Sequence, residues 1–122
     1  MEIPENIKDM MNSLAMHGYD AFIIGGAVRD AMMGVEPNDY DIFTNATGRG
    51  ILAIFSDGKI IGGGERQEKI LTVIVRGVEI SQYRANGDRT KVGLSLYKHL
   101  ETCDFRMNAI AMDIHGSTID PH

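Results

Sequence analysis

The strongest constraint on the fold is a pair of glycines followed closely by two aspartates. Residues 25–30 read Gly-Gly-Ala-Val-Arg-Asp, and residues 39–41 read Asp-Tyr-Asp. The glycines predict a tight turn that opens a helix, and the aspartates begin a predicted strand over 39–44. Because alternate residues of a strand face the same side, Asp39 and Asp41 should project together, about 6 to 7 Å apart.

This arrangement suits a site that handles phosphate. Carboxylate oxygens are preferred ligands of Mg²⁺, and the free backbone N–H groups of the turn can bind phosphate. Gly25 and Gly26 would permit a close approach because they carry no side chain. The combination indicates transfer of a nucleotidyl or phosphoryl group. An ordinary turn followed by two solvated aspartates is the alternative. The third glycine of G-x-G-x-x-G and the Walker pattern are missing, which argues against Rossmann and P-loop sites.

The composition bounds the class of protein. The chain has 122 residues, 43% of them hydrophobic, which predicts one domain over residues 1–122. No run of 18 apolar residues occurs, so neither a membrane span nor a membrane partner is expected. The polar, acidic start argues against a signal peptide. Cys103 is the only cysteine, so no internal disulfide can form, and a cytoplasmic location is expected.

The charge balance argues against nucleic-acid binding by this chain alone. Its net charge is −5, whereas domains that hold RNA or DNA by themselves are normally basic. A local basic patch could still bind nucleic acid. The alternative interpretation of the same residues is a solvated charged loop. The candidates for that patch are Arg84, Arg89, Lys91 and Lys98. The histidines show no metal-ligand spacing and are interpreted as incidental.

Apolar periodicity predicts an α/β (α+β) chain with a mixed, partly antiparallel sheet and flanking helices. The predicted helices cover residues 4–17, 26–33, 47–55, 94–101 and 104–111. The predicted strands cover residues 21–24, 39–44, 59–61, 69–76 and 78–83, with a short strand near 119–121. Gly77 predicts a hairpin, and the polar residues 85–93 predict a loop.

Four segments in one order resemble a known family. Residues 25–30 match Gly-Gly-x-Val-Arg-Asp, and residues 34–44 match its Asp-x-Asp segment. Residues 78–84 are similar to Glu-Val-x-x-Phe-Arg, and residues 104–111 to the end of Arg-Arg-Asp-Phe-Thr-Ile-Asn-Ala-Leu-Ala. Residues 23–121 thus resemble the head (palm) domain of class II tRNA nucleotidyltransferases (CCA-adding enzymes) and bacterial poly(A) polymerases. These belong to the polymerase-beta-like nucleotidyltransferase superfamily.

The resemblance implies roles for three acidic residues. Asp39 and Asp41 would be the catalytic carboxylates that hold two Mg²⁺ ions. One ion would lower the pKa of the primer 3′-hydroxyl, and the other would neutralise the triphosphate and the leaving pyrophosphate. Glu79 is a candidate third carboxylate, with a solvent-facing strand glutamate as the alternative.

The resemblance also implies a nucleotide-binding set. Gly25, Gly26 and Arg29 would hold the triphosphate. Arg29 has pairing with a neighbouring aspartate as its alternative role, and Asp30 suits a helix start whatever its function. The remaining matches are Arg84 and Asp104, near phosphate and sugar, and Asn108, which would order its segment through hydrogen bonds.

The implied activity is Mg²⁺-dependent transfer of a nucleoside monophosphate from ATP or CTP to a hydroxyl, with release of pyrophosphate. An RNA 3′ end, above all that of tRNA, is the implied acceptor. Two rival functions stay open: a non-RNA acceptor, or a non-catalytic module that binds nucleotide or a partner. The nucleotide added is left undetermined, because the family's neck domain reads the base.

Two departures from the family matter. Residues 102–103 read Thr-Cys where the family has an arginine pair, and the family's neck, body and tail domains are expected to be absent. The face that the neck would cover is expected to bind a second copy of the chain or a helical partner. Its expected apolar residues are Ile110, Ile114 and Ile119.

Overall fold

The computed structural model describes residues 3–61, 72–85, 88–93, 96–100 and 110–119. The helices are α1 (Glu5–Met16), α2 (Gly26–Met32), α3 (Gly48–Ile54) and α4 (Leu96–Leu100). The strands are β1 (Phe22–Ile24), β2 (Asp41–Thr44), β3 (Lys59–Ile61), β4 (Thr72–Val75), β5 (Val78–Ala85), β6 (Asp88–Gly93), β7 (Ala111–Met112) and β8 (Thr118–Ile119). No helix in these ranges is long and apolar enough to cross a membrane.

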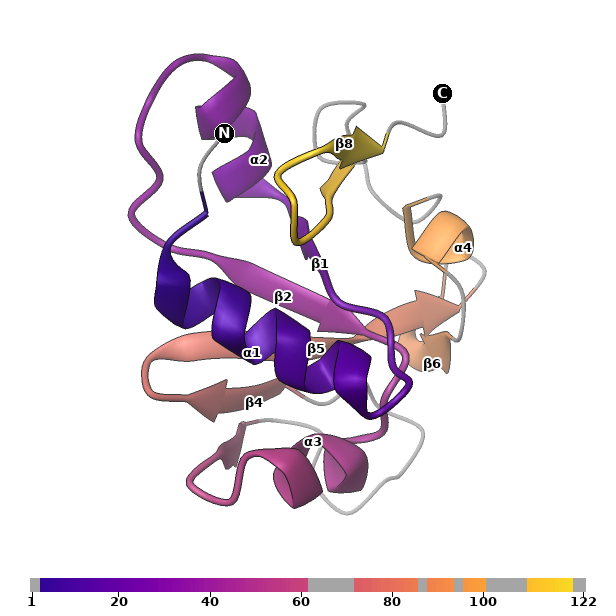
Figure 1. The fold of residues 1–122 in the computed structure, drawn as a ribbon. Helices are drawn as coiled ribbons and strands as arrows, with labels where there is room; N and C mark the ends of the chain where they lie inside the picture. The colour runs from indigo at the N-terminus through magenta and orange to yellow at the C-terminus, as the bar shows by residue number, and fades with distance from the viewer. Residues whose placement is uncertain (1–2, 62–71, 86–87, 94–95, 101–109, 120–122) are drawn as a thin grey trace.

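The strands form a mixed sheet, as the sequence predicts. Their order is β3–β4–β5–β2–β1–β7–β8, and β6 pairs with β5. The central strands β2 and β5 run parallel, whereas the other strand pairs of the described chain are antiparallel. Figure 1 shows this sheet with α1 lying across it and α2 at the end of β1. The parallel pair lies at the centre, where the sheet is most protected from solvent.

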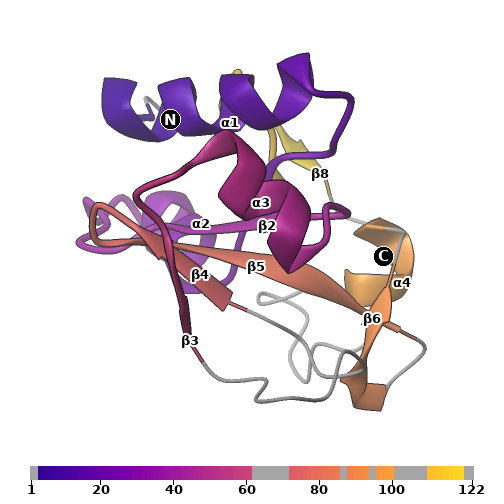
Figure 2. The same ribbon diagram turned by 90° about the horizontal axis from the view of Figure 1, so that it is seen from below.

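Each face of the sheet has its own hydrophobic cluster. Along β1, Ile23 belongs to the larger cluster and Ile24 to the smaller one, so the clusters lie on opposite faces. The larger cluster includes the apolar stripe of α1, whose members are Ile7, Met10, Met11 and Leu14. Figure 2 shows α1 and α3 together on one side of the sheet. Helix α4 covers only part of the other face, through Leu96 and Leu100.

Several predicted elements are confirmed in place. The helix predicted for residues 4–17 is α1, and the helix predicted for 47–55 is α3. Thr47 caps α3, because its Oγ1 accepts a hydrogen bond of 3.1 Å from the backbone N–H of Gly50. The predicted hairpin joins β4 and β5, with positive φ at Arg76 (47°) and Gly77 (81°). Two consecutive positive φ values favour the turn that matches the twist of a hairpin.

Three predictions about elements are wrong. Residues 88–93 of the predicted loop form β6, because their backbone pairs with β5 although their side-chain pattern is polar. The prediction that a helix extends to Ala111 is wrong, because Ala111 lies in β7 and pairs with Ile24. The rest of that predicted helix, residues 104–109, lies outside the described residues. Strand β2 begins at Asp41, so Asp39 lies before the strand and not within it.

Candidate active site

Strands β2 and β5 bring two acidic side chains next to each other. Their parallel register places Asp41 opposite Glu79 and Ile42 opposite Ile80. Both isoleucines are buried in the larger cluster, so the two carboxylates project from the opposite face of the sheet. Asp41 is half-buried and Glu79 is exposed. The structure thus joins residues that are far apart in the sequence.

Asp39 completes a group of three carboxylates. It is exposed and lines a cavity of about 300 Å³ together with Asp41 and Glu79. Tyr40 and Gly77 complete the lining. Asp39 and Asp41 therefore line one cavity, although only Asp41 lies on a strand.

Electrostatics mark this cavity as a place where negative charge is concentrated. The pKa of Asp41 is raised from 3.8 to about 6. The causes are burial, the charge of Glu79, a hydrogen bond with Glu79 and the charge of Asp39. Burial is the largest of these causes, because removal from water disfavours the charged form. A cation among these oxygens would relieve the repulsion.

The donor set fits magnesium that arrives with a phosphate ligand. Among the described residues, no group of three His, Cys, Asp or Glu side chains could hold a metal ion by itself. Mg²⁺ seldom needs one, because it is usually held by one or two carboxylates, water and substrate phosphates. Asp39 and Asp41 supply two carboxylates that face one open cavity. Their chemistry suits a hard, oxygen-binding cation.

The diglycine turn lies at the same end of the sheet. Gly25 follows β1 directly, and the pairing of Ile23 with Ile42 brings the end of β1 beside the start of β2. Gly25 has φ 100° and ψ −139°, a backbone conformation that requires glycine. Gly26 begins α2, and a side chain there would meet Arg29 Nη2 at 3.6 Å, an ordinary contact. The backbone therefore requires glycine at Gly25 and leaves space at Gly26.

Arg29 brings positive charge to this turn. Its Nε lies 3.6 Å from Oδ1 of Asp30, and its side chain is 47% exposed. The pairing that the sequence offered for Arg29 is therefore present. An ion pair this exposed contributes about 0 to 1 kcal/mol, so it would cost little for Arg29 to contact a phosphate instead.

An aromatic cluster extends the face that carries the carboxylates. Phe43 lies two residues after Asp41 on β2, and Tyr83 lies on β5. The ring of His99 packs against both, with centroid distances of 4.6 Å to Phe43 and 5.6 Å to Tyr83. His99 is buried between α4 and the sheet, so this histidine has a structural role in the packing of α4. Its spacing in the sequence gave no sign of this role.

Several predicted residues are not brought to the site by the described structure. Arg84 lies on β5, but its side chain is outside the described part of the chain. Asp104, Asn108 and residues 102–103 also lie outside it. The same holds for the side chains proposed as a basic patch, which are those of Arg84, Arg89, Lys91 and Lys98.

The prediction that Ile110 lies on an exposed apolar docking face is wrong. This side chain is 6% exposed and belongs to the larger cluster. Ile114 and Ile119 are half-buried against the two clusters. The large apolar side chains most exposed in the described chain lie elsewhere. They are Met16, Met32, Met33, Val35, Ile60 and Ile61.

Comparison with known proteins agrees with the fold. Residues 21–122 match the poly A polymerase head domain family. The CCA-adding enzyme of Geobacillus stearothermophilus is 36% identical over 121 residues, which cover 92% of this chain and 30% of that protein. The CC-adding tRNA nucleotidyltransferase of Halalkalibacterium halodurans is 34% identical over 114 residues, 92% of this chain and 28% of that protein. The chain thus spans about a third of the length of these relatives.

Solved structures give the same result. The crystal structure of the Bacillus stearothermophilus CCA-adding enzyme in complex with CTP has a TM-score of 0.79 and 35% identity, and covers 100% of this chain and 31% of that one. The Thermotoga maritima CCA-adding enzyme complexed with tRNA has a TM-score of 0.70, at 19% identity, over 97% of this chain and 30% of that one. The second likeness shows the fold alone. Together with the family match over residues 21–122, these findings confirm the resemblance, and the chain belongs to the poly A polymerase head domain family.

Proposed function

We propose that this chain is the catalytic head of a Mg²⁺-dependent tRNA nucleotidyltransferase of the CCA-adding type. It would transfer a nucleoside monophosphate from CTP or ATP to the 3′-hydroxyl of a tRNA and release pyrophosphate. One observation carries the proposal: Asp41 and Glu79 lie in register on adjacent parallel strands, with Asp39 in the same cavity. The relatives named above and the CTP complex of one of them support the choice of substrates.

Each part of the site has a task in this reaction. The 3′-oxygen attacks the α-phosphorus of the nucleotide, the bond from that phosphorus to the bridging oxygen breaks, and pyrophosphate leaves. The backbone N–H groups around Gly25 and Gly26, with the Arg29 guanidinium, would bind the triphosphate and stabilise the charge on the leaving pyrophosphate. Mg²⁺ held by Asp39 and Asp41 would supply a Lewis acid that lowers the pKa of the attacking hydroxyl.

A second acceptor class is favoured by one observation, the net charge of −5. This charge disfavours a long nucleic acid on the head by itself. The rival proposal therefore keeps the chemistry and the three carboxylates but uses a small molecule or a protein side chain as acceptor. In either case the single cysteine supports our placing the reaction in the cytoplasm.

The test has a binding arm and a transfer arm. Calorimetry would measure CTP binding with and without Mg²⁺. Labelled CTP and ATP would then be offered with Mg²⁺ and a tRNA that lacks its CCA end, beside a control without RNA. Asp41→Asn removes one carboxylate of the site. Asp9→Asn, on the exposed side of α1, removes the same charge elsewhere.

We expect Mg²⁺-dependent CTP binding and label on the tRNA, both lost in Asp41→Asn and kept in Asp9→Asn. Turnover that does not need RNA would favour the rival acceptor. Mg²⁺-dependent binding without any turnover would favour a non-catalytic module or a head that needs further protein. CTP binding that is unchanged in Asp41→Asn would contradict the proposed site itself.

A further inference from the structure

We infer that Tyr40 is a positioning residue, whose ring fixes the backbone that carries Asp39 and Asp41. The inference rests on the proposed function, because it concerns how the chain holds its metal-binding carboxylates. Tyr40 would act through the backbone that carries the two aspartates and not as a metal ligand.

The first argument is that β2 alone does not fix both aspartates. The first residue of β2 is Asp41, and its backbone is held by pairing with β5. Asp39 and Tyr40 come before the strand. The position of Asp39 must therefore depend on contacts of the segment between Pro37 and the strand.

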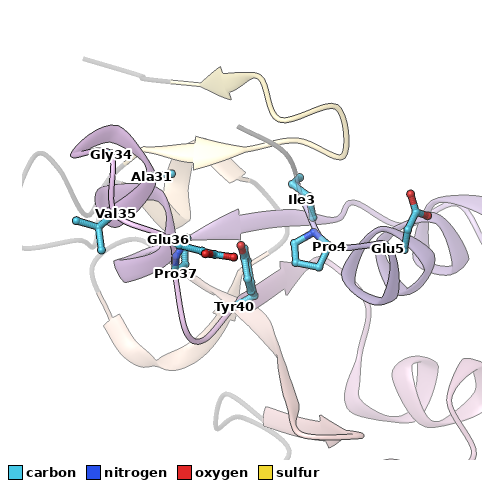
Figure 3. A pocket seen from close by; sticks show the side chains of 9 residues that line it. All are labelled: Ile3, Pro4, Glu5, Ala31, Gly34, Val35, Glu36, Pro37 and Tyr40. Atoms are coloured by element: carbon cyan, nitrogen blue, oxygen red, sulfur yellow. The ribbon is translucent and has the colours of Figure 1, made fainter.

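The second argument is the environment of the Tyr40 ring. It is half-buried and packs against the larger cluster. It lines a groove of about 590 Å³, with Ile3 and Pro4 on one wall and Glu36 and Pro37 on the other. Figure 3 shows the ring between Pro4 and the Glu36–Pro37 wall. The ring is thus flanked by two segments, one leading into α1 and one leaving α2.

Tyr40 also connects this groove to the carboxylates. It lines a cavity of about 260 Å³ with Pro4, Pro37 and Asp39, and the cavity of about 300 Å³ that holds the three carboxylates. Among the residues that the structure describes, no other lines all three of these cavities. A shift of the ring in its groove is therefore transmitted over one residue in each direction to the metal-binding side chains.

Geometry explains why such a shift matters. The Tyr40 ring packs against the larger cluster, which also holds Ile42, whereas Asp41 lines the open cavity. Proline has a fixed φ, which makes both walls of the groove stiff. If the ring is removed, the segment can relax toward the empty space. A misplacement of about 1 Å at a catalytic centre can cost about 100-fold in rate.

The test measures metal binding in place of activity. Mn²⁺, a paramagnetic substitute for Mg²⁺, would be titrated into the chain and followed by electron paramagnetic resonance. Tyr40→Ala removes the ring, and Tyr40→Phe keeps it without the hydroxyl. Tyr19→Ala is the matched control, because Tyr19 is also half-buried against the larger cluster. Thermal unfolding of each variant would be recorded in parallel, and Tyr40→Leu would replace Tyr40→Ala if that variant does not fold.

We expect Tyr40→Ala to weaken Mn²⁺ binding by about tenfold or more, and Tyr40→Phe and Tyr19→Ala to bind within about twofold of the wild type. The inference would be overturned if Tyr40→Ala and Tyr19→Ala lost Mn²⁺ affinity equally, or if Tyr40→Ala lost none. Either result would leave the proposed function unaffected. Two other outcomes would overturn the metal site of the proposed function, and this inference with it. One is that the wild type binds no Mn²⁺. The other is that Asp41→Asn binds Mn²⁺ as tightly as the wild type.

Discussion

At the residue scale, Asp41 connects stability with function. Its carboxyl group is half-buried beside Glu79 and near Asp39, and its pKa is raised to about 6. A charged Asp41 is therefore unfavourable in the fold without a cation, and a cation bound at the proposed site would make it favourable. Such local conflicts are typical of functional sites, where a group serves a ligand at a cost in stability.

The stability of the metal-free chain should depend on pH through this residue. The pKa of Asp41 rises from 3.8 to about 6 on folding, so the folded state binds the proton more tightly than the unfolded state. This contribution to stability is complete below the unfolded pKa and is lost as the pH rises through the folded pKa. Urea unfolding of wild type and Asp41→Asn at about pH 4 and about pH 8 would isolate the contribution of Asp41 and its coupling to Glu79 and Asp39, because titrating groups remote from Asp41 cancel in the difference.

At about pH 8 without divalent cations, we expect Asp41→Asn to be more stable than wild type by about 1 kcal/mol, after allowance for screening by water. The gain should disappear near about pH 4, where the aspartate itself is neutral in the folded state. Added Mg²⁺ should stabilise wild type and leave Asp41→Asn unchanged. A variant that is equally destabilised at both pH values would contradict this account of the site.

The two glycines of the turn should respond differently to the same substitution. Gly25→Ala should lower the free energy of unfolding by about 1 to 3 kcal/mol, because φ 100° is strained for any side chain. Gly26→Ala should change it by less than about 1 kcal/mol, because its Cβ would make only an ordinary contact with the Arg29 side chain at the helix start.

Denaturant unfolding checks these two values, and CTP titration of Gly26→Ala adds a separate result. If phosphate approaches the backbone at this turn, the methyl group should weaken CTP binding in a chain that is still fully folded. Equal stability losses in the two variants would show that the strain is not specific to Gly25.

At the scale of elements, some helices and strands form because of local capping, and others form because of pairing with a distant strand. Helix α3 contains two glycines, which lower its intrinsic propensity, yet it forms at the predicted place because Thr47 caps it. Strand β6 has no comparable local signal, since its polar residues form a strand only by pairing with β5. The prediction therefore succeeded where the cause is local and failed where the partner is distant.

The cap of α3 makes a second test of stability. Thr47→Ala removes the oxygen that accepts the Gly50 N–H and should lower the free energy of unfolding by about 1 kcal/mol. Thr47→Ser keeps the oxygen and should stay close to the wild type. Thermal or urea unfolding would measure both, and similar losses in the two variants would assign the effect to the methyl group of Thr47.

At the scale of the whole molecule, charge limits what this chain can hold. With 12 basic and 17 acidic residues, it has no overall attraction for the phosphates of a long RNA. It also covers only about 30% of the length of its CCA-adding relatives. Nucleotide binding and tRNA binding should therefore be separable in this chain.

We expect the chain to bind CTP with Mg²⁺ but to form no stable complex with tRNA at about 0.1 M salt, because its net charge of −5 disfavours contact with phosphates. Transfer of label to tRNA would then take place in short encounters. Calorimetry with CTP and an electrophoretic mobility shift with tRNA would test the two parts. A tRNA complex that weakens steeply with added salt would reveal a basic surface and contradict the prediction.

The sequence by itself determined the local features of this protein. The apolar spacing of residues 5–16 defines α1, and the positive φ at Gly25 is possible only because that residue is glycine. The order of the four motifs along the chain is sufficient to indicate the family. These features depend on neighbouring residues, whose interactions can be read along the chain.

Only the tertiary structure decided how the site is assembled. No spacing in the sequence places Glu79 opposite Asp41, because that contact depends on a parallel pairing of β2 and β5 across a long connection. The same holds for Tyr40, whose groove is built from residues near the start of α1 and after α2. Contacts between distant segments depend on how whole elements pack, and local sequence patterns carry little information about that packing.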